Sequence, residues 1–497
     1  MDIIRNFPAI AILLCLFAGI FSSGLKEKAA GLVNSCLIVI EIGLNLATLL
    51  YTISLGDSFV YVMGKFPAPW GNELRVGVLE ALLALFFCVI MFLSMWGGKH
   101  KLKDEVDPEK TFLYYVLLDL LLSSLLALIY TNDLFTAYVF VEINTISACG
   151  LIMIRQNGRT IEAAVRYMIM SLLGSGLLLL GICMLYDMTG HLLMSNIHEA
   201  ILTIVAEGQY TIPLLIMIAL ISVGLAIKSA LFPFHAWLPD AYGYSTVSAA
   251  AILSSLVSKG YIFLLIKIMY RVVGIDIFRN SHITDILFLF GLMGMIFGSL
   301  SAIRENDVRR MIAFSSVAQI GYIYMGFGMG TEAGMVASIF HILSHAATKS
   351  LLFIAAIGLT EVSDGKRQFI YLTGSGYRNK MSGVTFTVGS LAMVGVPLFS
   401  GFISKLLFSQ AAILNHGKML PAMIVLAIST ILNAIYFMKT VIRIYTPVPN
   451  SPYPPMDLRE HWRYATALFL FIVLNVVLGV FSDPIVRLIS NGLAMLG

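Results

Sequence analysis

The sequence is poor in charged residues, which make up 12% of its 497 residues, whereas 59% are hydrophobic. Soluble domains carry roughly 25% charged residues, so this deficit excludes an ordinary water-soluble protein and indicates an integral membrane protein in a lipid bilayer. The net charge of +4 is small for this length. It gives no indication of a nucleic-acid partner, and none is predicted.

Closely spaced cysteines are also missing. The five cysteines are scattered through apolar segments and no two are spaced as C-x-x-C. Such pairs are the usual sequence sign of an iron–sulfur or structural zinc site. The sequence therefore predicts no cofactor and no metal in this chain. Long polar stretches are scarce too, so no soluble domain is expected.

Apolar stretches long enough to cross a bilayer, about 20 residues each, recur along the whole chain. They lie near 3–22, 29–54, 76–96, 111–130, 133–154, 162–187, 212–236, 244–272, 283–303, 307–330, 333–359, 381–411, 419–445 and 464–490. The first is longer than the apolar core of a cleavable signal and is predicted to be a span. The predicted fold class is an all-α polytopic membrane protein with about 14 transmembrane helices.

Lysine and arginine outside the spans lie mainly in the connections that follow odd-numbered spans. Loops rich in these residues stay on the cytoplasmic side of a membrane. This bias predicts a multi-pass protein of the cell (cytoplasmic) membrane with both termini on the outer side. It also requires an even number of spans.

Several ionisable side chains fall inside the predicted spans, where a lysine costs about 2.5–3.5 kcal/mol on insertion scales. The central ones are Glu142, Lys228, Lys259, His341, His345, Lys349 and Lys405. Ionisable residues at this depth are functional candidates by default. Glu41 and Asp119 are central as well, and a role in transport and simple pairing with a neighbouring helix or partner chain are both left open.

Two further residues lie near the ends of spans. Lys267 is expected to extend its amine to the membrane interface, as long basic side chains do. Glu80 is expected to lie at the surface or to cap a helix. Neither is included among the candidates for ion transport.

One apolar stretch, 225–243, is interrupted by proline. Lys228 lies in its first part, and Pro233 removes a backbone donor and breaks the helix. Such a break is tolerated only where it faces protein or a water-lined cavity. The stretch is predicted to lie in the middle of an ion pathway, with His235 and Asp240 as mouth or structural residues.

A second interrupted stretch, 395–406, contains Gly395, Pro397 and Gly401 beside Lys405. Broken segments at corresponding places in two halves are typical of inverted-repeat transporters with a site near the midplane. The predicted domains are a three-helix N-terminal segment (1–107), a first repeat with helices 4–8 (108–275), a second, inverted repeat with helices 9–13 (276–446), and a connector with helix 14 (447–497).

His341, His345 and Lys349 are spaced four residues apart and share one helix face, with rises of about 6 Å. Water molecules can bridge such gaps, so the spacing predicts a proton relay. A metal site at the two histidines is disfavoured because no glutamate lies between them and no third ligand is evident. Burial disfavours the charged form of Lys228 and a nearby carboxylate favours it, so approach of Glu142 would act as a switch and not as an enzyme site.

Six motifs between about residues 110 and 410 occur in the order of a known family. They are NDLFTAYVFVEI (132–143), KSALFPFHAWLPDAY (228–242), SAAAILSSLVSKGYI (248–262), DVRRMIAFSSVAQIGYI (307–323), HILSHAATKSLLF (341–353) and GVPLFSGFISK (395–405). With them the chain resembles the antiporter-like subunits shared by Mrp-type cation/proton antiporters, respiratory complex I and membrane-bound hydrogenases.

The resemblance implies a role for each central residue. Glu142 resembles the fifth-helix glutamate that pairs with a seventh-helix lysine, here Lys228, and Lys259 resembles the central basic residue of the eighth helix. His341, His345 and Lys349 resemble the relay of the eleventh helix, and Lys405 the terminal lysine of the twelfth. The implied partners are other membrane subunits of one complex, including further antiporter-like subunits, and the implied cargo is protons, with sodium as an alternative.

Two positions depart from the family pattern. Leu398 stands where members often have a second proline, so a milder break is expected in the twelfth span. Residue 405 is lysine where the complex I subunit closest in length has glutamate, which favours the Mrp-type or hydrogenase-type branch. A proton-pumping subunit of a complex I-type NADH:quinone oxidoreductase stays an alternative.

Two alternatives from other classes are weaker. A passive membrane anchor of a redox arm does not need five lysines inside its spans. A quinone-binding oxidoreductase subunit would need a cofactor pocket, for which the sequence gives no sign.

Overall fold

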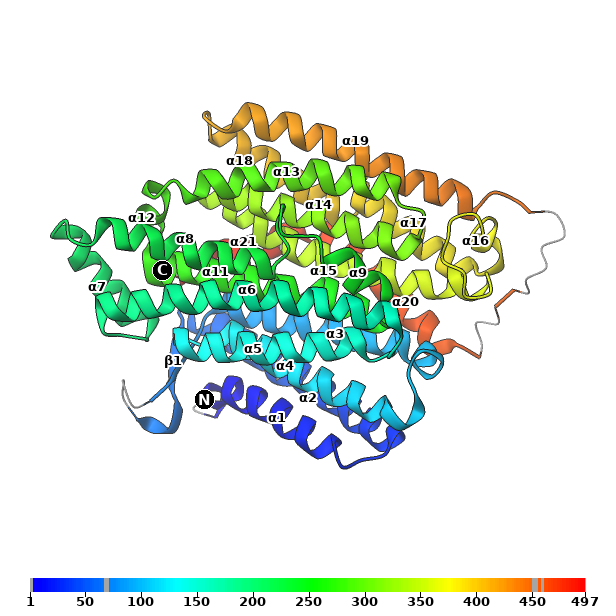
Figure 1. Ribbon diagram of the computed structural model, residues 1–497, viewed down its shortest axis with the longest axis horizontal. Coiled ribbons are helices and arrows are strands. Elements are labelled where there is room, and N and C mark those ends of the chain that lie inside the picture. Colours follow the sequence, from blue (N-terminus) through cyan, green and yellow to red (C-terminus); the bar gives the residue numbers. More distant parts are fainter. Residues whose placement is uncertain (1–2, 67–70, 449–454, 457–459, 497) are drawn as a thin grey trace.

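Long apolar runs form helices here because a bilayer offers no water to backbone N–H and C=O groups. In the computed structural model these helices lie roughly side by side along the horizontal axis of Figure 1. The structure describes residues 3–66, 71–448, 455–456 and 460–496. Most of the predicted connector after residue 447 lies outside the described residues.

The elements of the first half are α1 (Phe7–Ser22), α2 (Glu27–Leu55), β1 (Phe59–Val62), β2 (Glu73–Val76), α3 (Val78–Glu105), α4 (Thr111–Tyr130), α5 (Leu134–Met153), α6 (Gly158–Thr189), α7 (Met194–Ala206), α8 (Thr211–Lys228) and α9 (Leu238–Tyr244). The second half contains α10 (Val247–Ile252), α11 (Ser258–Ile268), α12 (Ile275–Asn280), α13 (Ile283–Arg304), α14 (Val308–Gly328), α15 (Glu332–Glu361), α16 (Ser375–Arg378), α17 (Lys380–Val394), α18 (Ser400–Leu414), α19 (Met419–Ile444), α20 (Trp462–Val480) and α21 (Ser482–Ala494). Two π-helical segments, Leu253–Val257 and Met269–Val273, lie before and after α11.

Thirteen helical segments among the described residues are long and apolar enough to cross a membrane, with 247–273 counted as one. The predicted twelfth span, 381–411, is made instead of two short helices, α17 and α18. Together these segments confirm the all-α polytopic membrane fold with about 14 spans.

Three local features differ from the prediction. The polar connection 55–75 contains an antiparallel hairpin in which Phe59 pairs with Val76, and the connection 188–211 contains α7. The last predicted span, 464–490, is not continuous because α20 ends at Val480 and α21 begins at Ser482. Pro484 explains this interruption, since its ring clashes with the carbonyl four residues back in a helix.

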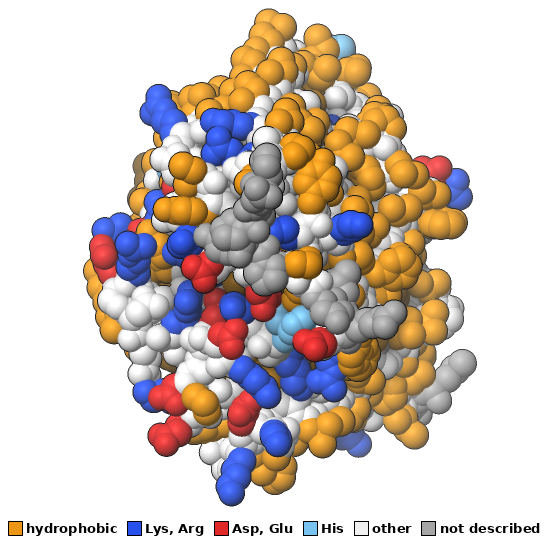
Figure 2. All heavy atoms as spheres, turned by 90° about the vertical axis from the view of Figure 1, so that its right-hand side faces the viewer, with side chains coloured by type: hydrophobic (Ala, Val, Ile, Leu, Met, Phe, Trp, Pro, Cys, Tyr) orange, Lys and Arg blue, Asp and Glu red, His pale blue; other side chains and the backbone are white. Residues whose placement is uncertain are grey.

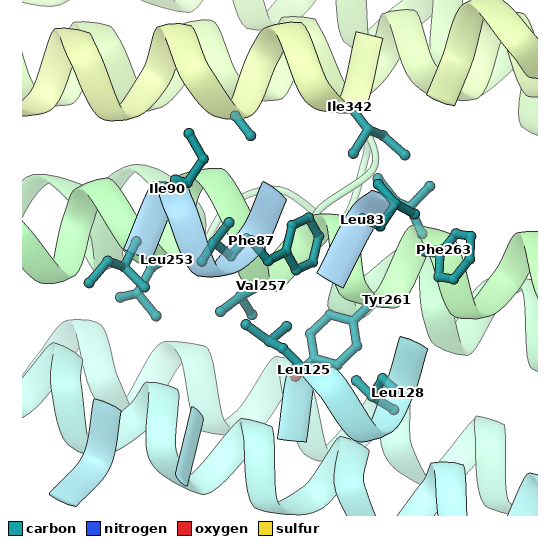
Figure 3. Packing of buried hydrophobic residues seen from close by; sticks show 14 of the residues in the cluster. Leu83, Phe87, Ile90, Leu125, Leu128, Leu253, Val257, Tyr261, Phe263 and Ile342 are labelled. Atoms are coloured by element: carbon teal, nitrogen blue, oxygen red, sulfur yellow. The ribbon is translucent and has the colours of Figure 1, made fainter. Parts of the chain in front are cut away.

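Two spans are enclosed by the others. The apolar windows of 247–273 and of α15 are completely buried, whereas those of α1 and α19 are only one-third buried. Figure 3 shows the apolar side chains around the first of them, with Leu125 and Leu128 of α4 on the side of Tyr261 and Leu83 of α3 on the side of Phe263. Lys259 and the residues of the predicted relay therefore lie on the two most enclosed helices.

Charged side chains gather at one end of the helices. This end, called the basic face below, includes the ends of α3 and α15, the start of α6 and the start of α14, whose residues line a common cavity. Figure 2 shows basic and acidic side chains over the middle and lower part of this face, with apolar side chains around its edge. Both ends of the chain lie toward the opposite side in Figure 1.

Candidate functional site

The first interrupted span ends directly after Lys228. α8 stops at this residue, and Ala230 has a φ of +61°, in the left-handed region. The N–H of Leu231 then donates to the carbonyl of Ala226, five residues back, at 3.0 Å. This is a Schellman cap. The helix is thus interrupted before Pro233, whereas the sequence had predicted the break at Pro233 itself.

The second interrupted span ends in the same way. α17 stops at Val394, Gly395 has a φ of +91°, and the N–H of Val396 donates to the carbonyl of Leu391 at 3.0 Å. The milder break expected at Leu398 stays a prediction. Five residues separate α17 from α18, against nine between α8 and α9. Leu398 has a φ of +89°, which proline cannot adopt because its ring holds φ near −65°.

Both breaks carry a lysine at the carboxyl end of a half-helix. Lys228 is the last residue of α8. Lys405 reaches back from α18, and its Nζ donates to the carbonyls of Met393 (3.3 Å) and Val394 (2.5 Å) at the end of α17. The carboxyl end of a helix has a partial negative charge, so both positions favour a cation.

Lys228 is 1% exposed and contacts polar groups of two other helices. Its Nζ donates to Oγ1 of Thr145 on α5 at 2.8 Å, and it lies 5.3 Å from the ring centroid of Tyr261 on α11. The Tyr261 hydroxyl in turn donates to Oδ1 of Asn144 at 2.9 Å. α5, α8 and α11 are thereby joined around one amine.

Glu142 lies one helical turn before Thr145 on α5. It forms no ion pair with Lys228, and its Oε1 is buried without a hydrogen-bond partner among the described residues. The two predicted partners therefore form no direct ion pair in this structure, and Thr145 is the direct partner of the amine.

Lys259 is completely buried beside a distorted turn. Its Nζ donates to the carbonyl of Ser254, within the π-helical segment Leu253–Val257. Short π-helical turns inside α-helices are frequent at functional sites. Ser255 in the same turn lies 2.8 Å from Ser350 Oγ on α15, so this turn touches the helix of the predicted relay.

The two histidines of α15 are buried and parallel. Their ring centroids are 5.8 Å apart with an interplanar angle of 8°. His341 Nδ1 shares a hydrogen bond with Ser404 Oγ at 2.6 Å, whereas both ring nitrogens of His345 have no partner among the described residues. His345 is thus held by packing alone.

Lys349 completes the face on α15. Its Nζ donates to the carbonyl of Ile312 at 2.9 Å and to the hydroxyl of Ser315, both on α14. Tyr322 on α14 stacks on His341 at 5.5 Å, and Nζ of Lys405 lies 6.0 Å from the same tyrosine ring. α14 therefore connects the relay residues of α15 to the amine at the second break.

The lysines share one electrostatic property. Within the described part of the chain, none of Lys228, Lys259, Lys349 and Lys405 forms an ion pair with a carboxylate. Their amines donate to carbonyls or hydroxyls instead. An amine held by such neutral acceptors can bind or release a proton without leaving a buried carboxylate unpaired.

Glu41 and Asp119, whose role in transport or in simple pairing the sequence left open, lie apart from these lysines. Asp119 on α4 accepts from Asn34 Nδ2 at 2.6 Å, and Glu41 on α2 accepts from Asn45 Nδ2 at 3.4 Å. Both carboxyl groups are fully buried and form no ion pair with a described basic residue. Polar pairing with a neighbouring helix is thus observed for Asp119.

His235 and Asp240 lie after the first break. The ring of His235 stacks on that of Phe232 at 5.3 Å. Asp240 forms ion pairs with Arg166 of α6, at 2.9 Å, and with Arg310 of α14. Asp240 therefore fixes α9 to α6 and α14 at the basic face. Neither ion pair involves one of the four buried lysines.

Lys267 and Glu80 do not lie where the sequence had predicted them. Lys267 does not reach the interface: it is completely buried, and its Nζ donates to the carbonyls of Leu128 (3.1 Å), Ile129 (2.9 Å) and Thr131 (2.6 Å) at the end of α4. The end of a helix leaves such carbonyls unpaired, so this lysine serves as a cap.

Glu80 does cap a helix, because its Oε2 accepts from the N–H of Gly77 at the start of α3 at 3.1 Å. It is not at the surface, however. Its side chain is 1% exposed and pairs with Arg271 at 2.5 Å.

We expect the Lys267→Met substitution to destabilise the protein without stopping ion transport. It leaves three buried carbonyls without their donor, and each unsatisfied group costs about 1–3 kcal/mol. Thermal unfolding of the purified protein measures the loss, with the exposed Lys28→Met as the matched control. An unchanged melting temperature together with lost transport would move Lys267 into the transport path.

Several contacts of the site were not singled out from the sequence. Thr145, Tyr261, Ser315, Tyr322 and Ser404 are ordinary polar residues of apolar helices, and only their packing shows that they touch the buried amines and histidines. The last four lie within the six family motifs, and Thr145 follows Glu142 by three residues and therefore shares its helix face.

Known proteins show the same architecture. Residues 131–432 match the family model described as NADH:quinone oxidoreductase/Mrp antiporter, TM. A curated relative, NADH-quinone oxidoreductase subunit N of Desulforudis audaxviator, is 32% identical over 453 residues, which cover 88% of this chain and 87% of the relative.

Two solved structures are similar over the whole chain. One is from the membrane-bound sulfane sulfur reductase, an archaeal respiratory membrane complex, with a TM-score of 0.88, 26% identity and coverage of 100% of this chain and 98% of the other. The other is from the Mrp complex of Dietzia sp., with a TM-score of 0.87, 22% identity and the same coverage. The latter likeness shows the fold. With the family match over more than half of its length, this chain belongs to the NADH:quinone oxidoreductase/Mrp antiporter family of antiporter-like membrane subunits.

Proposed function

We propose that this chain moves protons along a row of buried side chains within a larger membrane complex. The row is Glu142, Lys228, Lys259, His341, His345, Lys349 and Lys405. The observation that carries the proposal is that four buried lysines have polar contacts but no carboxylate partner in the described part of the chain. Lys267 is also buried without a carboxylate partner, but it caps the end of α4. The four amines of the row lie instead at the two helix breaks, at a π-helical turn and on the helix face of the two histidines.

The two breaks act as gates. Each carboxyl half-helix end favours a charged amine, while burial favours a neutral one. A change in the separation between Glu142 and Lys228 therefore changes which form of the lysine is stable. Moving one charge across 100 mV takes about 2.3 kcal/mol, and a pKa change of one unit corresponds to 1.36 kcal/mol, so a change of under two units is sufficient.

The matching Schellman caps support the proposal of two inverted repeats, 108–275 and 276–446, between the N-terminal segment 1–107 and the C-terminal segment 447–497. In each repeat the cap precedes a break that holds a lysine amine at a carboxyl helix end. Inverted repeats with broken helices place the site near the midplane and give one gate to each side of the membrane.

The basic face supports an orientation. Because lysine and arginine favour the cytoplasmic side, we place that face inside a cell membrane and both termini outside. The similar solved chains belong to multisubunit membrane complexes. We therefore propose that other membrane subunits, including further antiporter-like chains, accompany this one.

Among such complexes we favour an Mrp-type or hydrogenase-type assembly, because Lys405 and the two structural likenesses point that way. The curated relative named subunit N of NADH-quinone oxidoreductase supports the complex I-type alternative. The chains that copurify decide: iron–sulfur clusters or nickel mean a redox-driven pump, and their absence means an antiporter.

The test of transport is proton movement in vesicles reconstituted with the purified complex. A pH-sensitive dye inside the vesicles should report proton flux when the complex is driven by its electron donor or by a sodium gradient. Flux that needs sodium supports cation/proton exchange. No flux under either drive would overturn the proposal.

A further inference from the structure

A cavity at the basic face lies apart from the row of buried side chains. It has a volume of about 640 Å³ and opens onto the surface of the protein. Five basic side chains line it, against two acidic ones: Lys101, Arg155, Arg159, Arg309 and Arg367 against Asp104 and Glu105. Its charge is therefore positive, and its volume is in the range of small-molecule sites.

The acidic side chains do not neutralise the cavity. Asp104 is bound by Lys101 at 2.8 Å. Glu105 is shared between Arg155 (3.6 Å) and Arg309 (3.7 Å), and it also accepts from the N–H of Val247 at 3.0 Å. Arg367 pairs with Asp307, just outside the lining, at 3.2 Å. Two positive charges therefore remain in excess.

The arginines keep donors that no protein group uses. Arg309 is only 3% exposed, yet its Nε is buried without a hydrogen-bond partner among the described residues. Arg159 is exposed and stacks on the ring of Tyr244 at 5.6 Å, with no hydrogen bond among those described. A buried donor without an acceptor costs about 1–3 kcal/mol, so the site lacks an acceptor.

The start of α6 points to an anion. The side-chain Oδ1 of Asn157 accepts from the N–H of Thr160, and the N–H groups of Gly158 and Arg159 have no acceptor among the described residues. The space at Gly158 is open, since no described atom lies within 4 Å of the place that a Cβ would occupy there. The amino end of a 32-residue helix attracts negative charge and binds phosphate well.

We propose that this cavity binds a phosphate-bearing ligand. The phosphate would accept from the free N–H groups at the start of α6 and from Arg159, Lys101 and Arg309. Arginine suits phosphate because its planar fork donates two parallel hydrogen bonds. Basic pockets between membrane helices on the cytoplasmic side take anionic lipid headgroups, and a soluble phosphate offers the same chemistry.

The site also touches the first gate. Arg155 donates to the carbonyl of Tyr244 at 3.1 Å, Arg367 donates to that of Gly243 at 2.7 Å, and Arg309 donates to that of Ser245. These carbonyls end α9, the helix that follows the break after Lys228. The ligand would therefore lie against the arginines that hold α9.

The experiment uses the full chain with its accompanying membrane subunits in nanodiscs. In zwitterionic nanodiscs, inorganic phosphate is added at constant ionic strength, with chloride as the reference. In a second arm, cardiolipin is included in the nanodiscs. We expect at least one arm to raise the melting temperature. Phosphate alone should do so if the ligand is soluble, cardiolipin alone if it is a lipid, and both if the site accepts either.

Arg159→Gln and Lys101→Gln should each weaken binding about tenfold in the responding arm, as expected for a lost hydrogen bond to a charged group. Lys28→Gln, which removes the same charge away from the cavity, should bind as the unsubstituted protein does. Melting without ligand shows that each variant is folded. The proposal is overturned if neither arm exceeds chloride, or if Arg159→Gln and Lys101→Gln respond like Lys28→Gln.

Discussion

Replacing Lys228 with methionine is expected to stop proton uptake by reconstituted vesicles, with a loss of at least about a hundredfold. Methionine has a similar length but no proton to exchange, and it leaves Thr145 without its donor at the end of α8. Losing one such hydrogen bond costs about 0.5–1.5 kcal/mol, which the fold tolerates. The loss should therefore be seen in dye-reported flux and not in the amount of assembled complex.

The hydrogen bond between Lys228 and Thr145 provides a matched control variant. Thr145→Val removes the same hydrogen bond but keeps the amine, so it should lower flux by no more than about tenfold. Glu142→Gln should abolish flux if the carboxylate switches the lysine, and the Glu142→Gln/Lys228→Met double variant should lose no more than either single one. Normal uptake by Lys228→Met would refute the first gate, and additive losses would refute its pairing with Glu142.

The fold was predictable because the bilayer restricts the choices. Apolar runs, their lengths and the lysine and arginine bias were sufficient for the spans. Both interrupted spans were found too, since Pro233 and Gly395 stand beside lysines in apolar sequence. The start of the first break was missed because Ala230, with φ of +61°, is held there by its surroundings and not by its own preference.

The contacts of the site were less predictable. Sequence spacing brought His341, His345 and Lys349 to one face, because that spacing is a property of one helix. It gave no means of seeing that Lys267 caps α4 whereas Lys259 lies at a π-helical turn. Both are lysines in the same apolar span, and only the packing of α4 against α11 distinguishes them.

Lys405 is the second residue for which a large effect is expected. Lys405→Ala should lower proton uptake at least tenfold, because it removes the exchangeable proton and leaves the carbonyls of Met393 and Val394 without their donor. Lys405→Glu should keep part of the activity. In its protonated form a carboxyl group has one O–H donor, so it can donate to one of these two carbonyls and still exchange a proton.

Flux through vesicles compares the two variants, and Lys405→Met is the matched control, since it restores the bulk of the side chain without a proton. Lys405→Met should behave like Lys405→Ala. Equal losses in Lys405→Glu and Lys405→Ala would show that a proton-exchanging group at this position is not sufficient, and that the second break needs a positive charge. Full activity in Lys405→Met would remove Lys405 from the pathway, and the row of buried side chains would then end at Lys349.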